Sequence, residues 1–240
     1  MEPPVTTTPQ HQSKTKLLDA ALSVIRVKGY SATTVDDICA AAGITKGSFF
    51  HHFKSKDDLA LAATAHFNSM ADALFANAPY QNLEDPFERL LGYIDLRIAL
   101  LSDELAQCTC LLGTLVQETY ATHPQIRSAC EDAMAAHIAQ LTRDVEAAKQ
   151  RYARTQPWSA HSVGDFIQGV LQGSFVLAKA NLSAEVARQN LEHLRRYLCV
   201  LFDRPPDATA KKPSRSTKPR TTARRADSPS ASKEQSRARS

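Results

Sequence analysis

Residues 33–53 read TTVDDICAAAGITKGSFFHHF, and this stretch decides the fold of the chain. Thr33 is a favourable N-cap residue, and Asp36 three positions later completes a capping box. Gly43 ends this first short helix, because the chain must reverse sharply there and only glycine enters the positive-φ region freely. Thr45 then caps a second short helix. Two short helices joined by a tight glycine turn are typical of a helix-turn-helix that binds DNA.

The second helix of this pair has two chemically distinct faces. Phe49 and Phe53 are four residues apart, so they share one face and are expected to pack against Ile38 and Leu22. Gly47 costs about 1 kcal/mol of helix stability relative to alanine, which is understandable if the backbone must approach the edge of a duplex. The outer face holds Lys46, Gly47, Ser48, Phe50, His51 and His52.

The flanking segments are also helical in pattern, so the sequence predicts an all-α protein without strands. A first helix carries Leu17, Leu18, Ala21, Leu22 and Ile25 on one face and ends before Gly29. Ser55 and Asp58 form a capping box that opens a longer helix to about Asn77. Further helices are expected over residues 87–101, 105–122, 124–152, 161–181 and 184–202.

Composition divides the chain into four parts. Residues 1–12 lack apolar periodicity and are predicted to form a disordered arm. Residues 13–60 form the helix-turn-helix domain, and residues 61–204 form a second helical domain. Residues 205–240 are rich in Ser, Thr, Pro, Lys and Arg, which predicts a disordered tail.

The net charge of +4 hides an asymmetry between the tail and the body of the chain. The tail carries ten Lys and Arg against three acidic residues, so the remaining residues sum to −3. The chain has no apolar run of about 18 residues, which argues against a membrane span. Its five cysteines are typical of reduced thiols. We therefore expect a cytoplasmic protein that has no contact with membranes.

The motifs around the helix-turn-helix resemble the N-terminal domain of the TetR/AcrR family of regulators. The dense part of the resemblance lies in TTVDDI at 33–38, AGITKGSFFHHF at 42–53 and KSKDDL at 54–59. A weaker similarity continues through CLLG at 110–113 and GSFVLAKA at 173–180. The resemblance implies a homodimer of about nine helices per subunit, with a C-terminal domain for ligand binding and dimerisation. It further implies a repressor that binds a palindromic operator in double-stranded DNA and is released by a small-molecule effector.

The resemblance also assigns DNA contacts residue by residue. Residues 46–48 match positions that read the major groove, and Phe50 and His51 match positions that touch bases and phosphate. Residues 33–34 and Lys56 match positions at helix N-termini that face phosphate. Phe50 departs from the family, which most often has a tyrosine that donates to a phosphate, so Phe50 is assigned van der Waals contact. The predicted DNA-binding set is Thr33, Thr34, Thr45, Lys46, Gly47, Ser48, Phe50, His51, His52 and Lys56.

The helices 161–181 and 184–202 are predicted to form the homodimer interface. Their apolar residues follow a four-three spacing, which is typical of the seams of a helix bundle. A dimer is needed because helix-turn-helix proteins read two half-sites about one helical turn apart. The alternative is that both stripes face only the core of their own subunit. The stripes are Phe166, Val170, Gly173, Leu177 and Ala180, and Ala187, Leu191, Leu194, Leu198 and Leu201.

The helices between residues 55 and 153 are expected to enclose a mostly apolar effector site. Nothing in the sequence names the effector, and neither a cofactor nor a metal is predicted. The candidate ligand-binding residues are Phe67, Met70, Tyr93, Arg97, Cys110, Gln117, Tyr120 and Trp158.

The segment Cys108-Thr109-Cys110 is open to three interpretations. Cys110 matches a position that some family members use to sense electrophiles or oxidants, and it lies near a helix start, where thiols are activated. Buried cysteine is also an ordinary small apolar residue. A metal site shared with His123 or Cys130 is the third interpretation.

Other classes of function find less support in the sequence. The adjacent pairs His51-His52, Asp36-Asp37 and Asp57-Asp58 diverge by about 100° on a helix, so they cannot converge on one substrate atom as an enzyme requires. An architectural DNA-binding protein and an activator stay open as alternatives. The basic tail either adds salt-sensitive contact to DNA beside the operator or is a passive solubilising terminus.

Overall fold

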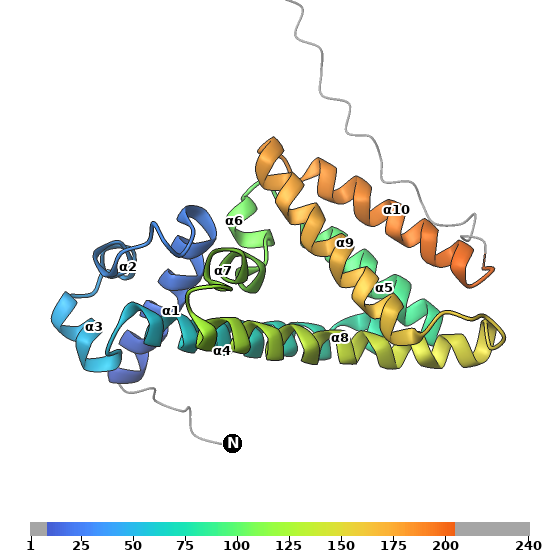
Figure 1. Cartoon of the computed structure of the whole chain (residues 1–240), viewed down its shortest axis with the longest axis horizontal. Helices are drawn as coiled ribbons and strands as arrows, with labels where there is room; N and C mark the ends of the chain where they lie inside the picture. The colour runs from blue at the N-terminus through green and yellow to red at the C-terminus, as the bar shows by residue number, and fades with distance from the viewer. Residues whose placement is uncertain (1–8, 205–240) are drawn as a thin grey trace, which may run out of the picture. The chain divides into compact units, whose positions relative to one another are not determined.

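The computed structural model describes residues 9–204, which form ten α-helices and one 3₁₀ helix and contain no strand (Figure 1). Nine of these α-helices have seven or more residues, so the prediction of an all-α fold of about nine helices is confirmed. The elements are α1 (Pro9–Lys28), α2 (Val35–Ala42), α3 (Lys46–His52), α4 (Lys56–Ala76), η1 (Pro79–Asn82), α5 (Pro86–Ala99), α6 (Leu105–Cys108), α7 (Leu111–Thr119), α8 (Pro124–Tyr152), α9 (Ala160–Asn181) and α10 (Glu185–Leu201).

The cap of α2 lies one residue later than predicted. Thr34 is the N-cap, since its Oγ1 accepts from the backbone N of Asp37 at 3.1 Å. Asp37 Oδ2 accepts from the backbone N of Thr34 at 2.9 Å, so Asp37 and not Asp36 completes the capping box. The reason is that the Thr33 hydroxyl is used elsewhere, donating to the carbonyl oxygen of Gly29 at 2.6 Å.

The turn between α2 and α3 follows the prediction. Gly43 has a φ of 63°, in the left-handed region that glycine enters without strain. Its backbone N–H donates to carbonyl groups at the end of α2, which closes the helix. Thr45 caps α3 and accepts from the backbone N of Ser48 at 3.2 Å.

Two predicted segments differ in the structure. α1 begins at Pro9, so residues 9–12 are helical and not part of a disordered arm; proline is favoured at the first helical position. The single helix expected over residues 105–122 is divided into α6 and α7, because Thr109 and Cys110 have extended backbones with ψ angles of 157° and 126°. Residues 1–8 and the tail at 205–240 lie outside the described residues, so the disorder predicted for both remains a prediction.

Two hydrophobic clusters form the core of residues 9–204. The first joins α1, α2, α3 and the first half of α4 to α7 and the beginning of α8. The second lies among α5, α8, α9 and α10. The 29-residue helix α8 takes part in both clusters and packs against α4, α5, α7 and α9 (Figure 1). The N-terminal helices therefore share their core with α7 and α8, and α4 continues without interruption across the domain boundary expected at residue 60.

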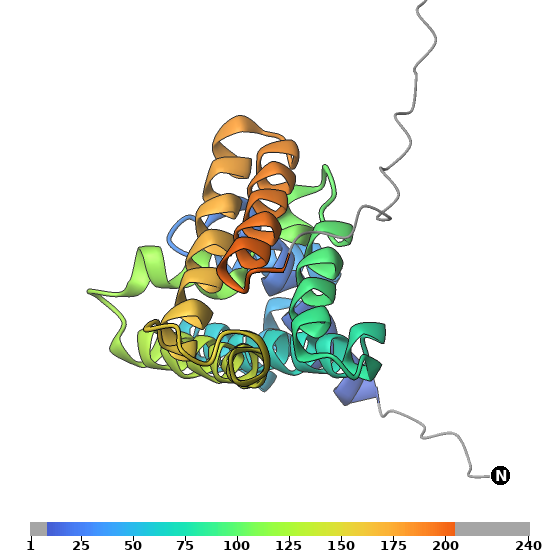
Figure 2. The same ribbon diagram turned by 90° about the vertical axis from the view of Figure 1, so that its right-hand side faces the viewer.

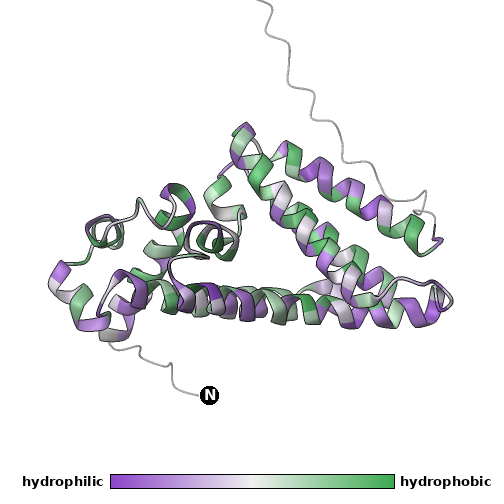
Figure 3. Ribbon diagram, in the orientation of Figure 1, coloured by the Kyte–Doolittle hydropathy of each residue, from purple (hydrophilic) through white to green (hydrophobic). Residues whose placement is uncertain are grey.

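The helices α9 and α10 pack side by side, as both views show (Figures 1 and 2). Hydrophobic and hydrophilic residues both recur along the length of α10 (Figure 3). The apolar stripe of α10 faces inward, since Ala187, Leu191, Leu194 and Leu198 are at most 2% exposed in the core of their own subunit. The prediction that this stripe forms the dimer interface is therefore wrong. α9 differs, because Phe166 and Leu177 of its stripe stay 45% and 46% exposed.

Among the described residues, no helix combines the length and the apolar character that crossing a membrane requires.

Candidate DNA interface and effector cavity

The recognition helix α3 is held by its aromatic face. Phe49 and Phe53 are buried in one cluster with Ile38 and Leu22, as the sequence predicts. Phe50 is 53% exposed, and its ring meets the ring of Phe49 edge-to-face with the centroids 5.1 Å apart. Burial of one face therefore leaves the opposite face of α3 toward solvent, where a duplex can approach it.

Gly47 has no role in packing within the described protein. A Cβ atom built at Gly47 would have Thr45 Oγ1 as its nearest neighbour, at 4.0 Å. Lys46, which precedes it, pairs with Asp36 at 2.9 Å, and both side chains are largely exposed. Such an exposed ion pair contributes little stability, so Lys46 can exchange Asp36 for a phosphate.

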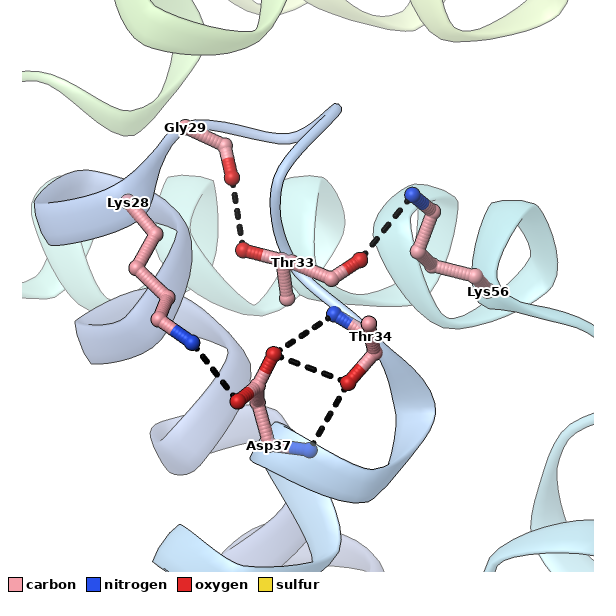
Figure 4. A network of polar contacts seen from close by, with 6 residues as sticks. All are labelled: Lys28, Gly29, Thr33, Thr34, Asp37 and Lys56. Atoms are coloured by element: carbon pink, nitrogen blue, oxygen red, sulfur yellow. Dashed lines mark hydrogen bonds and ion pairs between the residues drawn. The ribbon is translucent and has the colours of Figure 1, made fainter.

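Thr33 lies in the connection between α1 and α2, and Lys56, the first residue of α4, reaches back to it (Figure 4). Thr33 is 1% exposed. The ammonium of Lys56 donates to the carbonyl oxygens of Tyr30 and Thr33, both at 3.0 Å, and lies 4.2 Å from the centroid of the Tyr30 ring. The polar groups of these two side chains hold residues 29–34, so the phosphate contacts predicted for them would compete with these bonds and stay a prediction.

Thr34 is exposed, but its hydroxyl is shared with the capping box (Figure 4). It donates to Asp37 Oδ2 at 2.8 Å, while Asp37 Oδ1 accepts from Lys28 Nζ at 2.6 Å. The hydrogen bond from Lys28, followed by those from Thr34, lowers the pKa of Asp37 to about 2. The N-terminus of α2 therefore already carries a carboxylate, which weakens the case for a phosphate at Thr34.

The side chain of His52, the last residue of α3, is partly buried against α1. Its Nε2 lies 2.6 Å from the hydroxyl oxygen of Ser13. Burial lowers the pKa of His52, and the neighbouring positive groups of His51 and Lys14 lower it further. His52 thus joins α3 to α1, and the DNA contact predicted for it stays a prediction. The predicted residues that the structure leaves on the outer side of α3 are Thr45, Lys46, Gly47, Ser48, Phe50 and His51.

A carboxylate from α7 anchors the loop between α1 and α2. Glu118 Oε1 accepts from the backbone N of Tyr30 at 3.1 Å, and Oε2 accepts from the backbone N of Ser31 at 2.8 Å. Gly29 makes room for this contact: its φ is 82°, and a Cβ there would lie 2.2 Å from Glu118 Oε1. No spacing in the sequence relates residues so far apart, so this link between α7 and the helix-turn-helix was not predicted.

Replacing Gly29 with alanine is expected to destabilise the protein more than replacing Gly43. Both glycines have positive φ, and a non-glycine residue there costs about 1–2 kcal/mol. At Gly43 a Cβ meets nothing within 4 Å, whereas at Gly29 it displaces the Glu118 carboxylate and adds about 1 kcal/mol for the lost hydrogen bonds. The free energy of unfolding, determined by urea titration, measures the cost of each of the two substitutions. In a Glu118→Ala background the excess at Gly29 should vanish; an excess that persists there contradicts the role of Glu118.

A cavity of about 450 Å³ lies between α1, α4, α5 and the α6–α7 segment on one side and α8 and α9 on the other. Four of the eight predicted ligand-binding residues line it. These residues are Phe67, Met70, Arg97 and Cys110.

The other four predicted residues lie elsewhere. Tyr93 is buried behind the cavity, and its hydroxyl lies 2.8 Å from Nε2 of His137. Gln117 lines an adjoining hollow of about 220 Å³, which shares Thr109, Cys110 and Phe175 with the cavity. Tyr120 is 65% exposed, and Trp158 stacks edge-on against Phe202 at 5.2 Å. The chemical type of these four residues suits a ligand site, but only their neighbours in space decide which surface they join.

The lining also contains polar residues that the sequence did not indicate. Arg26 reaches the cavity from α1, where its Nη1 donates to the carbonyl oxygen of Ala106 at 3.0 Å and its guanidinium lies 5.0 Å from the Phe67 ring centroid. His137 and Gln168 enter from α8 and α9. A helix of the DNA-binding region thus forms part of the cavity wall.

Cys108 and Cys110 both line the cavity and are partly buried. All five cysteines are unbridged. Cys130 is buried, and burial raises the pKa of its thiol to about 11. Within residues 9–204 no group of three His, Cys, Asp or Glu side chains is arranged to hold a metal ion, so the metal interpretation gains no support. Thiol sensing by Cys110 stays a prediction.

The buried aromatic face of α3, its exposed outer face and the glycine turn define a helix-turn-helix DNA-binding protein. Two family models match the chain: bacterial regulatory proteins of the tetR family at residues 17–63, and the LmrA/YxaF-like transcriptional regulator C-terminal domain at residues 86–193. The chain belongs to the TetR family of transcriptional regulators, whose members are not enzymes.

Relatives and solved structures agree with this assignment. The transcriptional regulator AcuR of Cereibacter sphaeroides is 31% identical over 150 residues, which are 61% of this chain and 67% of AcuR. The HTH-type transcriptional repressor DhaR of a Mycobacterium species is 23% identical over 187 residues, covering 78% of this chain and 89% of DhaR. A TetR-family regulator from Agrobacterium tumefaciens has the same fold, with a TM-score of 0.70, 21% identity and coverage of 78% and 98% of the two chains. Relatives of this chain thus include a repressor.

Proposed function

We propose that the chain is a homodimeric repressor that binds a palindromic operator in the cytoplasm and is released by a small molecule in the 450 Å³ cavity. The observation that carries this proposal is that α1, a helix of the DNA-binding region, contributes Arg26 to the cavity wall. A ligand that touches Arg26 therefore touches the part of the protein that positions α3.

The operator contact in this proposal is the outer side of α3. Lys46 supplies a cation for phosphate, and Ser48 supplies a hydroxyl that can meet a base edge or the backbone. Gly47 lets the helix backbone approach the duplex, and the exposed ring of Phe50 offers apolar contact to a thymine methyl. A single such surface binds weakly, which is why two copies on one dimer are required.

The dimer interface in this proposal uses the exposed face of α9 together with the outer edge of α10. Phe166, Val176 and Leu177 are 45%, 47% and 46% exposed along α9. On α10, Tyr197 is 43% exposed and stacks on Phe166 with ring centroids 4.9 Å apart. Such a row of exposed apolar side chains on two adjacent helices is unusual for a surface that faces water, and a second copy would bury it.

The coupling between cavity and operator runs through two links. Arg26 connects the cavity to α1, and α1 connects to α3 through the Ser13–His52 contact. Glu118 connects α7 to the loop before α2, and α7 begins directly after the cavity residue Cys110. A ligand that favours a different position of α1 and α7 would therefore shift the population of DNA-competent dimers.

Selection of bound duplexes from a random DNA pool tests this function. We expect a single palindromic sequence whose half-sites are spaced by about one helical turn. Placement of that sequence over a promoter would support repression, and placement upstream of it would support activation. Recovery of duplexes without any shared sequence would overturn the proposal in favour of an architectural DNA-binding protein.

A further inference from the structure

The cavity has a one-sided electrostatic character. Two guanidinium groups reach it, Arg26 from α1 and Arg97 from α5. None of the described residues that line it is Asp or Glu. Because arginine stays charged at any physiological pH, these two side chains give the cavity a positive charge.

Arg97 is a partly buried cation whose side chain is hydrogen-bonded to Tyr93. Its Nε is buried without a hydrogen-bond partner, and no ion pair formed within residues 9–204 includes it. Its guanidinium carbon lies 5.0, 5.6 and 5.9 Å from the ring centroids of Phe75, Tyr93 and Phe175. These rings orient the guanidinium but do not neutralise it. A sheltered cation of this kind is costly unless an anion joins it.

Two further polar atoms at the cavity are unsatisfied. Thr109 is 3% exposed and its Oγ1 has no partner, and Gln168 is 8% exposed and its Oε1 has no partner among the described residues. His137 is close by, but burial and the charge of Arg97 lower its pKa to about 4, so it adds no positive charge at neutral pH. Buried polar groups are almost always paired in folded proteins. The Thr109 hydroxyl can donate to an anionic ligand group, whereas the amide oxygen of Gln168 is an acceptor and requires a donor.

Most of the remaining wall is apolar, with Asn68 as a polar exception. It consists mainly of Phe67, Met70, Leu74, Leu101, Leu112 and Met134. We propose that the ligand of this cavity is an amphipathic organic carboxylate, whose anionic group pairs with Arg97 near Arg26 and Thr109, while its apolar body contacts these apolar side chains. A volume of about 450 Å³ is within the range of small-molecule sites. Only the description of this ligand as the effector rests on the proposed function.

Calorimetric titration of the full-length protein tests the charge of the ligand directly. Octanoate and decanoate are each compared with the primary alcohol and the primary ammonium ion of the same chain length. We expect each carboxylate to bind at least ten times more tightly than its two counterparts. Equal or tighter binding of the alcohols or ammonium ions, or no binding of either carboxylate, overturns the proposal.

Variants at Arg97 test the residue. Arg97→Met keeps an unbranched side chain against the aromatic rings but removes the charge, so the preference for carboxylate over alcohol should disappear. Arg97→Lys should retain part of that preference, because it keeps a cation. Arg127→Met, in an exposed pair on α8, is the control and should bind like the wild type. A preference that survives in Arg97→Met overturns the role of Arg97; if that variant does not fold, the wild-type comparison still decides the ligand class.

A further measurement distinguishes the proposed ligand class from the proposed control of operator binding. Operator release by the same carboxylates is followed by fluorescence anisotropy of labelled DNA. Tight carboxylate binding without release would leave the ligand class intact and overturn control by the cavity. Release by a neutral or cationic compound, with no carboxylate preference in the titrations, would support control by the cavity and overturn the ligand class.

Discussion

Replacing Gly47 with alanine is expected to lower operator affinity about a hundredfold while leaving the protein at least as stable as the wild type. Glycine within a helix is less favourable than alanine by up to about 1 kcal/mol, and a Cβ at this position has open space around it. Against DNA the same methyl group enters a packed contact, which costs about 1–3 kcal/mol. Because a dimer carries two copies of α3, the loss applies twice, and each 1.4 kcal/mol is tenfold in affinity.

The Gly47→Ala variant is informative because operator affinity should fall while stability is maintained or rises. Anisotropy titration measures operator affinity, and urea unfolding measures stability. Val27→Ala is a suitable control, because Val27 is 69% exposed on α1 and the change also favours helix without altering α3. Unchanged operator affinity in Gly47→Ala would show that the backbone at Gly47 does not approach the duplex closely.

Replacing Leu177 with aspartate is expected to give a folded monomer whose operator affinity is at least a hundredfold lower. Leu177 is 46% exposed on α9, so aspartate meets water in the isolated subunit and disturbs its core little. In a dimer the same carboxylate would be buried without a partner, which costs several kcal/mol. A monomer then engages only one half-site and loses the additive contribution of the second.

Sedimentation velocity reports the oligomeric state of this variant, and circular dichroism reports its helix content. Leu83→Asp is the matched control, since Leu83 is 43% exposed in the segment between η1 and α5, away from the proposed interface. It should remain dimeric and bind the operator normally. A Leu177→Asp protein that stays dimeric would require another surface for the dimer.

Much of the fold follows from local signals in the sequence. The glycine at position 43, the cap at Thr45 and the spacing of Phe49 and Phe53 act over a few residues, and the structure agrees with each of them. The outer face of α3 was predictable for the same reason, because burial of one helix face determines which residues remain on the other.

The errors arise where a residue has two possible partners. Thr33 and Thr34 are both good caps, and only the carbonyl oxygen of Gly29 accounts for the choice of Thr34. The apolar stripe of α10 suits a dimer seam as well as a subunit core, and the packing of α5, α8 and α9 around it makes it core. Helix periodicity shows that a face is buried but not against what.

The sequence by itself determined the class of this protein, because helix caps, turns and amphipathic faces depend on residues a few positions apart. The tertiary structure alone decided which of the predicted polar residues are available for binding. It assigned Lys56 and His52 to internal contacts, and it brought Arg26 of α1 to the same cavity as Arg97 of α5. The physical reason is that such contacts join residues 23 to about 70 positions apart, whose proximity depends on how whole helices pack.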